Sequence, residues 1–428
     1  MSNKSKLSTE SYKGVRDFYP EDLFIQNYIF NTWRRVVESF GYTEYSASVL
    51  EPAELYKAKT GEEIVNEQTY TFTDRGKREV TLRPEMTPTV ARMVAQKQHD
   101  LVFPLRWYSI PNLFRYEKPQ KGRLREHWQL NVDIFGVDSN YADIEIITIA
   151  HRIMKGFGAK DDDFVIKINN RKIINALYKK FDLDEEKSHK VSKIIDKKNK
   201  ISVAGFEEAL TEIMGERALE FITSMESNEK LIEALGSNNK YTNELASLIE
   251  QLQDSGVTNI TFDPTLMRGF DYYTDMVFEV FDLHPDNNRS VFGGGRYNDL
   301  LDIFGAPKVP AVGFGAGDVT IRDFMETHGL TPKYKKTIDL YICTTETKYV
   351  KEANKLANNL RQNGLNVAVD FSDKKLGDQV KTAHKQNIPY VICVGEDEVK
   401  SGLYKVKNMD TGEEVKARID EIVNAIKK

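Results

Sequence analysis

An arginine, two tyrosines and a glycine run lie close together between residues 268 and 297. The segment 268–274 reads Arg-Gly-Phe-Asp-Tyr-Tyr-Thr, and the segment 293–297 reads Gly-Gly-Gly-Arg-Tyr. An arginine fork binds phosphate or carboxylate oxygens, and tyrosine hydroxyls donate and accept hydrogen bonds. Glycine leaves the backbone open to close approach. This combination predicts a site for a polar, nitrogen-bearing ligand held near phosphate.

A second polar constellation lies between Phe114 and Asp133. Pro119 and Gly122 mark a loop between two strand-like runs, which predicts a long hairpin. Side chains alternate across a strand, so the second run has an apolar face and a polar face. The apolar face carries Trp128, Leu130, Val132 and Ile134, and the polar face carries Gln129, Asn131 and Asp133.

On the first run of this hairpin, Arg115 and Glu117 also share a face. If the two polar faces coincide, the sheet presents arginine, glutamate, glutamine and aspartate to a common site. The pattern alone leaves an alternative open, which is an ordinary hairpin with one wet face.

The elements that must position these residues fall into three regions. Residues 11–170 alternate helical and strand patterns, and an amphipathic helix is predicted over 28–40, after the cap-like cluster at 20–22. Residues from about 171–256 are helical and lysine-rich, and strand and glycine signals return over 259–317. We therefore expect a helical insertion within an α+β domain. A solvated helical face is the alternative for the lysine-rich block.

A polar linker at 331–336 precedes a region with a different pattern. Strand and helix signals alternate there, with strands predicted at 339–343, 366–370 and 390–394 and helices at 351–363 and 379–386. This alternation predicts a small, separately folded α/β domain.

Composition narrows the class of protein. A chain of 428 residues forms two or three domains, and 40% hydrophobic with 29% charged residues is ordinary for a globular protein. No apolar run approaches the roughly 18 residues of a membrane span, and the start lacks the apolar core of a secretion signal. We expect a cytoplasmic protein without a membrane partner. The net charge of −5 argues against a uniformly basic nucleic-acid binder, so RNA contacts are expected from local patches.

The cysteines and histidines limit redox and metal chemistry. Only Cys343 and Cys393 occur, both in apolar strand-like runs, which predicts two buried reduced thiols and no disulfide framework. The seven histidines show no metal-ligand spacing, so no metal site on protein ligands is expected.

Taken in order, these segments resemble the motifs of histidyl-tRNA synthetases. The peptides 268–274 and 293–297 are similar to the two signature peptides of that family. Arg115-Tyr116-Glu117, with the loop through Arg123, resembles motif 2 of class II aminoacyl-tRNA synthetases. The segment 82–87, Leu-Arg-Pro-Glu-Met-Thr, resembles the family segment that binds the amino group of the substrate. The helix before Gly41 resembles motif 1, and residues 311–320 resemble motif 3. The region beyond 336 resembles the anticodon-binding domain.

The resemblance implies an α+β fold with a class II antiparallel sheet flanked by helices over 1–330. A helical insertion at about 171–256 and a C-terminal α/β anticodon-binding domain at 336–428 complete it. The implied activity is that of a histidine–tRNA ligase, which joins L-histidine to ATP as histidyl-adenylate and passes the histidyl group to the 3′ end of tRNA(His). Mg²⁺ is the implied cofactor, and motif 1 implies a homodimer.

The family roles transfer to individual residues of this chain. Arg268 and Arg115 are the implied catalytic groups, because positive charge must neutralise the phosphoryl oxygens as the carboxylate attacks the α-phosphorus. ATP binding falls to Arg115, Glu117 and Arg123. Histidine binding falls to Glu85, Thr87 and Gln129 at the α-ammonium group and to Asp133, Tyr273 and Tyr297 at the imidazole. Of the consecutive tyrosines, Tyr272 is assigned to the core.

Two positions depart from the family pattern. Asp133 stands where the family often has glutamate, and Thr320 stands where motif 3 usually has an arginine that contacts the γ-phosphate of ATP. Arg322 lies about 200° away around a helix, so it does not substitute for that arginine. Another cation is expected to supply the contact.

Two other functions stay open at this point. One is a histidine-sensing regulatory subunit of an ATP phosphoribosyltransferase, a silent relative that generally lacks the C-terminal domain. The other is a class II synthetase for a different amino acid.

Overall fold

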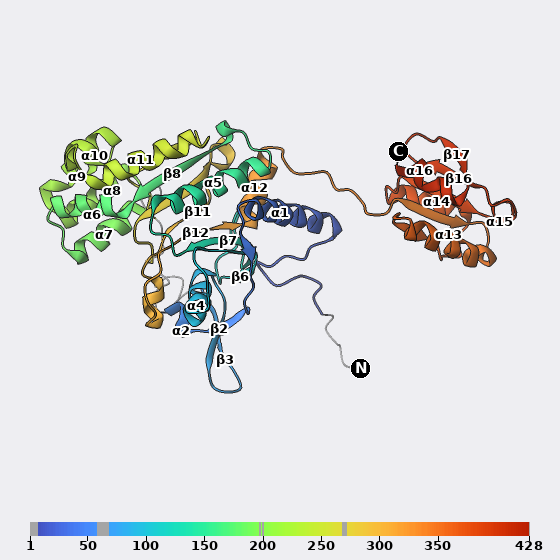
Figure 1. Ribbon diagram of the computed structural model, residues 1–428, viewed down its shortest axis with the longest axis horizontal. Coiled ribbons are helices and arrows are strands. Elements are labelled where there is room, and N and C mark those ends of the chain that lie inside the picture. The colour runs from blue at the N-terminus through green and yellow to red at the C-terminus, as the bar shows by residue number, and fades with distance from the viewer. Residues whose placement is uncertain (1–6, 58–67, 197, 199–200, 268–271, 428) are drawn as a thin grey trace. The chain divides into compact units, whose positions relative to one another are not determined.

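The computed structural model describes residues 7–57, 68–196, 198, 201–267 and 272–427 (Figure 1). The chain divides into two compact units, of which one reaches to Pro332 and the other begins at Lys333. Among the described helices, none is both long and apolar enough to cross a membrane.

A nine-stranded sheet forms the centre of the first unit, as far as the described residues show. Its order is β1-β5-β7-β12-β11-β10-β8-β9, with β6 paired to β7. The bounds are β1 Thr43–Glu44, β5 Leu105–Ser109, β6 Asn112–Phe114, β7 Glu126–Phe135, β8 Phe164–Asn170, β9 Ile260–Phe262, β10 Met276–Asp282, β11 Ser290–Arg296 and β12 Ala311–Gly317. All pairs are antiparallel except the outermost, β1 with β5 and β8 with β9. The predicted antiparallel sheet is confirmed.

Helices α1 (Pro20–Ser39), α5 (Asn140–Gly156) and α12 (Asp318–Thr327) lie beside the sheet (Figure 1). Leu130, Val132 and Ile134 of β7 join their core cluster, which also contains Trp33. The predicted apolar face of this strand is therefore confirmed. Its polar face is left free to line a site on the other side of the sheet.

Helix α1 begins earlier than the sequence pattern indicated. It was predicted over 28–40, and it starts at Pro20 with Glu21 and Asp22 in its first turn. Proline suits the first helical position because its missing N–H has no partner there in any helix, and acidic residues favour that end of the helix dipole. The cap-like cluster is therefore the first turn itself.

In the described part of the chain between β8 and β9, six α-helices form the predicted insertion, and they gather at one end of this unit (yellow-green in Figure 1). They are α6 Arg171–Lys180, α7 Glu185–Asp196, α8 Val203–Met214, α9 Ala218–Ser224, α10 Asn228–Leu235 and α11 Lys240–Asp254. A separate sheet of order β2-β4-β3 precedes α4. Its elements are β2 Leu50–Pro52, α2 Glu54–Lys57, β3 Tyr70–Thr73, β4 Glu79–Leu82 and α4 Thr87–Lys97.

The second unit is a five-stranded sheet of order β14-β13-β15-β16-β17 with helices around it. Its elements are β13 Leu340–Thr344, α13 Val350–Gln362, β14 Val367–Val369, α14 Leu376–Lys385, β15 Tyr390–Val394, α15 Glu396–Ser401, β16 Tyr404–Asn408, β17 Glu414–Ala417 and α16 Ile419–Lys427. The predicted α/β pattern is confirmed. Cys343 and Cys393 face each other on β13 and β15 as free thiols, but Cys393 is only half-buried, so the prediction of two buried thiols holds for Cys343 alone.

Candidate active site

A cavity of about 1160 Å³ opens on the polar side of β7. The alternation of side chains along this strand brings His127, Gln129, Asn131 and Asp133 into its wall. Arg115 and Glu117 line the same cavity. They do so from the loop after β6, which ends at Phe114, so the prediction that they share a strand face is wrong. The predicted meeting of arginine, glutamate, glutamine and aspartate at one cavity is nevertheless what the structure has, and the alternative of an ordinary wet hairpin face is wrong.

Glycines of β12 make room for these polar side chains. Gly313 pairs with Asp133 across the ladder, and a Cβ at Gly313 would collide with the Asp133 carboxylate. A Cβ at Gly315 would collide with the Gln129 amide. The two β7 side chains therefore lie flat over a neighbouring strand that carries no side chains on that face.

Asp133 is a buried acid in the cavity wall, with 4% of its surface exposed. Its Oδ1 accepts a hydrogen bond from the Tyr297 hydroxyl. Burial raises the pKa of the Asp133 carboxyl to about 7, and the Tyr297 bond acts in the opposite direction. Burial and the neighbouring carboxylate raise the pKa of Tyr297 well above its usual value. The two side chains form one hydrogen-bonded unit, and its carboxyl is the group whose pKa is near neutral.

Tyr272 joins a second polar group at the same end of the cavity. Its hydroxyl donates to Glu85 Oε2 at 3.0 Å and lies 3.4 Å from Thr87 Oγ1. Glu85 is 3% exposed, and the preceding Arg83 ties its segment to β6 through bonds to the carbonyl and side-chain oxygens of Asn112. Both Tyr272 and Tyr273 line the cavity, so the assignment of Tyr272 to the core alone is wrong.

The loop at 115–125 forms the other end of the cavity. Arg115 is anchored, because its Nε donates to the carbonyl oxygen of Pro84 at 2.9 Å. Arg123 is loose, because its side chain is 61% exposed and its Nη1 stands 3.8 Å from Glu117 Oε2. Glu117 itself is 15% exposed. An anchored and a mobile cation thus flank one partly buried carboxylate.

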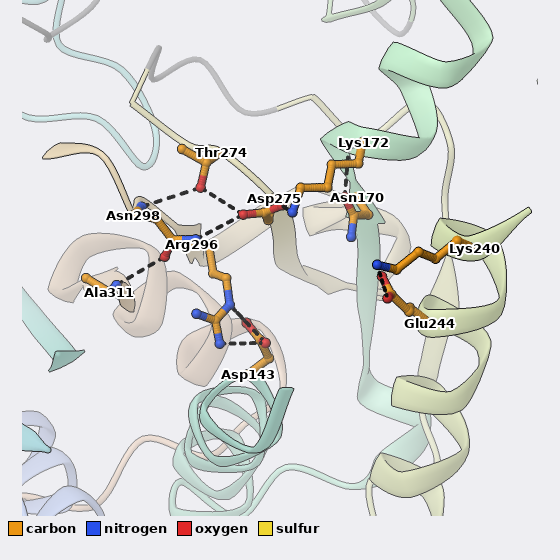
Figure 2. Close-up of polar contacts among 10 residues, drawn as sticks. All are labelled: Asp143, Asn170, Lys172, Lys240, Glu244, Thr274, Asp275, Arg296, Asn298 and Ala311. Atoms are coloured by element: carbon orange, nitrogen blue, oxygen red, sulfur yellow. Dashed lines mark hydrogen bonds and ion pairs between the residues drawn. The ribbon is translucent and has the colours of Figure 1, made fainter. Parts of the chain in front are cut away.

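The residues after the signature arginine are fixed by a polar network (Figure 2). Thr274 N donates to the carbonyl oxygen of Arg296 at 2.8 Å, and Asp275 Oδ2 accepts from the Thr274 hydroxyl and from Asn298 Nδ2, each at 3.1 Å. Lys172 forms an ion pair with Asp275. Arg268 itself lies outside the described residues, together with 269–271.

The insertion reaches this network and the cavity. Arg171, the first residue of α6, donates from Nη1 to the carbonyl oxygen of Tyr273 at 2.7 Å. Arg171 lines the cavity, and so do His189 and Lys193 of α7. The alternative of a purely solvated face for the lysine-rich block is therefore wrong for this part of it.

Two family models match the sequence. The model described as "Histidyl-tRNA synthetase" matches residues 14–318. The chain belongs to the histidyl-tRNA synthetase family. The model described as "Anticodon binding domain" matches residues 339–428. The resemblance stated from the motifs is confirmed, and the chain is a class II aminoacyl-tRNA synthetase that uses ATP.

Relatives cover almost the whole chain. The histidine–tRNA ligase of Leptospira biflexa serovar Patoc is 40% identical over 431 residues, which are 99% of this chain and 98% of the relative. The histidine–tRNA ligase of Thermoplasma volcanium is 35% identical and covers 99% of each chain. Among solved structures, a histidyl-tRNA synthetase from a Nostoc species superimposes with a TM-score of 0.82 at 25% identity, over 99% of both chains.

The residues assigned from the synthetase motifs meet in one place. Arg268 lies outside the described residues, and all the others line the cavity: Glu85, Thr87, Arg115, Glu117, Arg123, Gln129, Asp133, Tyr273 and Tyr297. The glycine run behaves differently from the expectation of close approach to substrate. Gly293 lines the cavity, but a Cβ at Gly294 would strike the β12 backbone and one at Gly295 would strike the Tyr273 ring. Sheet packing requires these two glycines.

Among the lining residues that sequence reasoning did not assign to the site are His127, Tyr272 and Arg171. His127 continues the spacing of Gln129 and Asn131, so the alternation of the strand could have identified it. Burial, followed by the positive charges of Arg115 and Arg16, lowers the pKa of His127 to about 3, so its ring is neutral at physiological pH. Tyr272 and Arg171 gave no comparable signal.

The synthetase motif 3 departs from the family pattern as the sequence indicated. Thr320 lines the cavity and donates its hydroxyl to the carbonyl oxygen of Gly317 at 3.1 Å, so it brings no charge. Arg322 is paired with Asp22 and Glu326 and does not line the cavity. The prediction that Arg322 does not substitute for the arginine is confirmed.

Proposed function

We propose that this chain is a histidine–tRNA ligase that forms histidyl-adenylate from L-histidine and ATP and then transfers the histidyl group to the 3′ end of tRNA(His). The observation that carries the proposal is the single cavity whose wall joins a buried acid–tyrosine pocket to an arginine-bearing loop, in a chain of the histidyl-tRNA synthetase family. One end suits an amino acid and the other suits a nucleotide.

Histidine occupies the end of the cavity that contains Asp133. The imidazole presents an N–H donor and a second nitrogen, and Asp133 accepts from the donor while Tyr273 or Tyr297 serves the other nitrogen. Support comes from the burial of Asp133 and its bond to Tyr297. An apolar isostere would leave these buried groups unpaired, which gives strong discrimination.

The α-ammonium group of histidine lies against Glu85, Thr87 and Gln129. Support comes from the buried Glu85 carboxylate, whose bond to Tyr272 fixes its orientation. Tyr272 is added to the set as the residue that holds Glu85 in place. A charged amine against a buried carboxylate is a strong hydrogen-bonded pair.

ATP occupies the end of the cavity that contains the 115–125 loop. The histidine carboxylate attacks the α-phosphorus and displaces pyrophosphate, as the bond from the α-phosphorus to the bridging oxygen breaks. Arg115 and Arg268 stabilise the charge that grows on the phosphoryl oxygens. Glu117 contacts the adenine end and Arg123 contacts the outer phosphates. Support comes from the anchoring of Arg115 to Pro84, which holds a cation beside the amino-acid end.

Mg²⁺ enters with ATP. Among the described residues there is no group of three or more side chains able to hold a metal ion. Mg²⁺ needs only one or two carboxylates in addition to the substrate phosphates, and Glu279 lines the cavity. When bound, Mg²⁺ neutralises phosphate charge. The donor set therefore fits a metal carried by the nucleotide.

The remaining parts of the chain bind tRNA and a second subunit. Residues 336–428 form the anticodon-binding domain and 1–330 the catalytic domain, with the insertion near the acceptor end of the tRNA. Support comes from the anticodon-domain match and from His189 and Lys193 in the cavity wall. The motif 1 helix forms the interface of a cytoplasmic homodimer. The regulatory-subunit alternative is less well supported, because curated relatives that cover the whole chain are ligases.

The deciding experiment is histidine-dependent exchange of labelled pyrophosphate into ATP, followed by charging of tRNA(His). We expect exchange with histidine, and none with the other amino acids, which serve as controls in the same preparation. Absence of exchange with histidine, or equal exchange with another amino acid, would overturn the proposal.

A further inference from the structure

Arg289 sits at the junction of two segments that line the phosphate end of the cavity. Its Nη1 donates to the carbonyl oxygen of Lys121 at 2.9 Å, and its Nη2 forms an ion pair with Asp323 of α12. Gly122, next to Lys121, and Thr320, one helical turn before Asp323, both line the cavity. The guanidinium group therefore bridges the loop and the helix that form this rim, next to lining residues but without being one itself.

Gly122 lets the guanidinium approach the loop closely. Its φ of +75° lies in the left-handed region, and a Cβ at this position would collide with Nη1, Cζ and Nη2 of Arg289. A side chain at 122 would displace the arginine. The loop therefore places bare backbone where the arginine meets it.

Hydrogen bonds to Asp282 hold the backbone of Arg289 and of the turn that precedes it. The carbonyl oxygen of Arg289 accepts from Asp282 N at 3.0 Å. Asp282 is fully buried, accepts from His284 N and Asn287 Nδ2, and contacts His328 Nε2 at the end of α12. The short turn that ends at Arg289 is thus pinned at both ends, and strand β11, whose Ser290 and Val291 line the cavity, begins directly after it.

We propose that Arg289 binds the outer phosphates of ATP and supplies the cation that Thr320 does not. The inference rests on the proposed function, since it assumes that ATP occupies this end of the cavity. The two bonds described use one N–H on each terminal nitrogen, whereas an arginine carries five N–H donors. A side chain that is 29% exposed and already held by Asp323 and Lys121 loses little freedom when phosphate binds.

A direct phosphate contact and a loop clamp predict different results. Arginine in a charge-assisted contact with phosphate acts on ATP but not on AMP, which has no outer phosphates. It acts on adenylate formation and not on transfer from preformed histidyl-adenylate, which has lost the outer phosphates. A residue that only held the loop would affect ATP binding, AMP binding, adenylate formation and transfer alike.

The test measures the Kd of Mg²⁺-ATP and of AMP by calorimetry on the full-length protein and on Arg289→Gln. We expect Arg289→Gln to raise the Kd for ATP about 10- to 100-fold, as for a lost charged hydrogen bond, with AMP changed less than about twofold. Transfer of the histidyl group from preformed adenylate to tRNA should keep its wild-type rate. Equal weakening of ATP and AMP, or a slowed transfer, would overturn the proposal in favour of a loop clamp.

Three variants keep the test decisive. Arg322→Gln removes an arginine of α12 that pairs with Asp22 and Glu326, and its ATP affinity should equal that of the wild type. Asp323→Asn removes the carboxylate that holds Arg289 but keeps the cation, so it should weaken ATP at least fivefold less than Arg289→Gln. Equal losses would mean that the ion pair, and not phosphate binding, is what matters. Arg289→Lys keeps the charge and is used if Arg289→Gln does not fold, with an intermediate ATP affinity expected.

Failure of this inference is distinguishable from failure of the proposed function. Wild-type protein that binds ATP without histidine-dependent exchange would overturn the ligase proposal and leave the ATP and AMP comparison valid. Wild-type protein that does not bind ATP would overturn both.

Discussion

The two ends of the cavity are built in opposite ways. At the amino-acid end, Asp133 and Glu85 are 4% and 3% exposed, and each carboxylate already accepts a tyrosine hydroxyl. At the nucleotide end, Arg123 is 61% exposed and stands 3.8 Å from its carboxylate partner. The first end is pre-organised by buried hydrogen bonds, and the second is carried largely by a loop.

The difference in burial between the two ends matches what the two proposed ligands, histidine and ATP, require. Discrimination among amino acids needs buried groups that lose their partners when a wrong ligand enters. A triphosphate carries several negative charges and Mg²⁺, so binding it demands charge more than shape. A loop with exposed arginines can close over such a ligand and release pyrophosphate afterwards. Arg115 is the link between the two ends, because it binds Pro84 next to Glu85.

The largest effect is expected from Arg115→Gln. This change removes an anchored cation from the α-phosphate, where charge grows in the transition state. We expect kcat for pyrophosphate exchange to fall about 10²- to 10³-fold, as for loss of a pre-organised charge-stabilising donor. The Kd for histidine, measured by calorimetry, should change less than about threefold. A loss that appeared mainly in histidine binding would assign Arg115 to the amino-acid end and break the division between the two ends.

The next effect concerns Asp133 and depends on pH. Because the pKa of this carboxyl is raised to about 7, it is largely protonated at pH 6 and ionised at pH 8. The ionised form is the better acceptor for an imidazole N–H, so the KM for histidine should fall as pH rises from 6 to 8. Asp133→Asn should raise KM about 10- to 100-fold at pH 8 and abolish this pH dependence. A pH dependence that survived in the variant would belong to another group.

The raised pKa of the Asp133 carboxyl also predicts how the stability of the ligand-free protein depends on pH. The folded pKa of this carboxyl lies above the unfolded value of about 3.9, so its contribution is fully present below that value and is lost as pH rises through about 7. Unfolding of the ligand-free wild type by urea should therefore show about 3 kcal/mol less stability at pH 8 than at pH 5 from this group. Asp133→Asn, measured at both values, isolates that contribution. Equal pH dependence in both proteins would contradict the raised pKa.

The same contrast marks what sequence could predict. The two faces of strand β7 could be predicted because the side chains of a strand alternate whatever the rest of the fold is. Its polar face supplied Gln129 and Asp133. Which of Tyr272 and Tyr273 faces the site could not be predicted from the sequence. They precede the first residue of β10, Met276, so the strand alternation does not apply to them.

Long-range contacts explain the other omissions. Arg171 enters the site because α6 begins at the end of β8 beside the signature peptide, and no local pattern encodes that meeting. Arg289 lies far from Lys121 and Asp323 in the sequence and meets both only in the fold. Site residues on strands can be predicted from the local sequence pattern, whereas site residues on loops depend on tertiary contacts.

A smaller effect is expected from the network behind the signature peptide. Asp275→Asn weakens the ion pair with Lys172 but keeps a side chain of the same shape for Thr274 and Asn298 (Figure 2). We expect the KM for histidine to rise about threefold to tenfold, as for a partly buried charged hydrogen bond, and the KM for ATP to stay within about twofold. Lys172→Met should give the same split. A larger change for ATP than for histidine would place this network at the nucleotide end.

The smallest effect is expected from Arg123→Gln, and it sharpens the comparison with Arg289. Both arginines lie at the nucleotide end, but Arg123 is 61% exposed whereas Arg289 is 29% exposed and bonded to two partners. An exposed arginine must give up about 2 kcal/mol of rotamer entropy to bind phosphate in one geometry, which offsets most of its charge interaction. The KM for ATP should therefore rise only about threefold to fivefold, with no change in thermal stability. If Arg123→Gln weakened ATP as much as Arg289→Gln, pre-positioning would not be what distinguishes the two arginines.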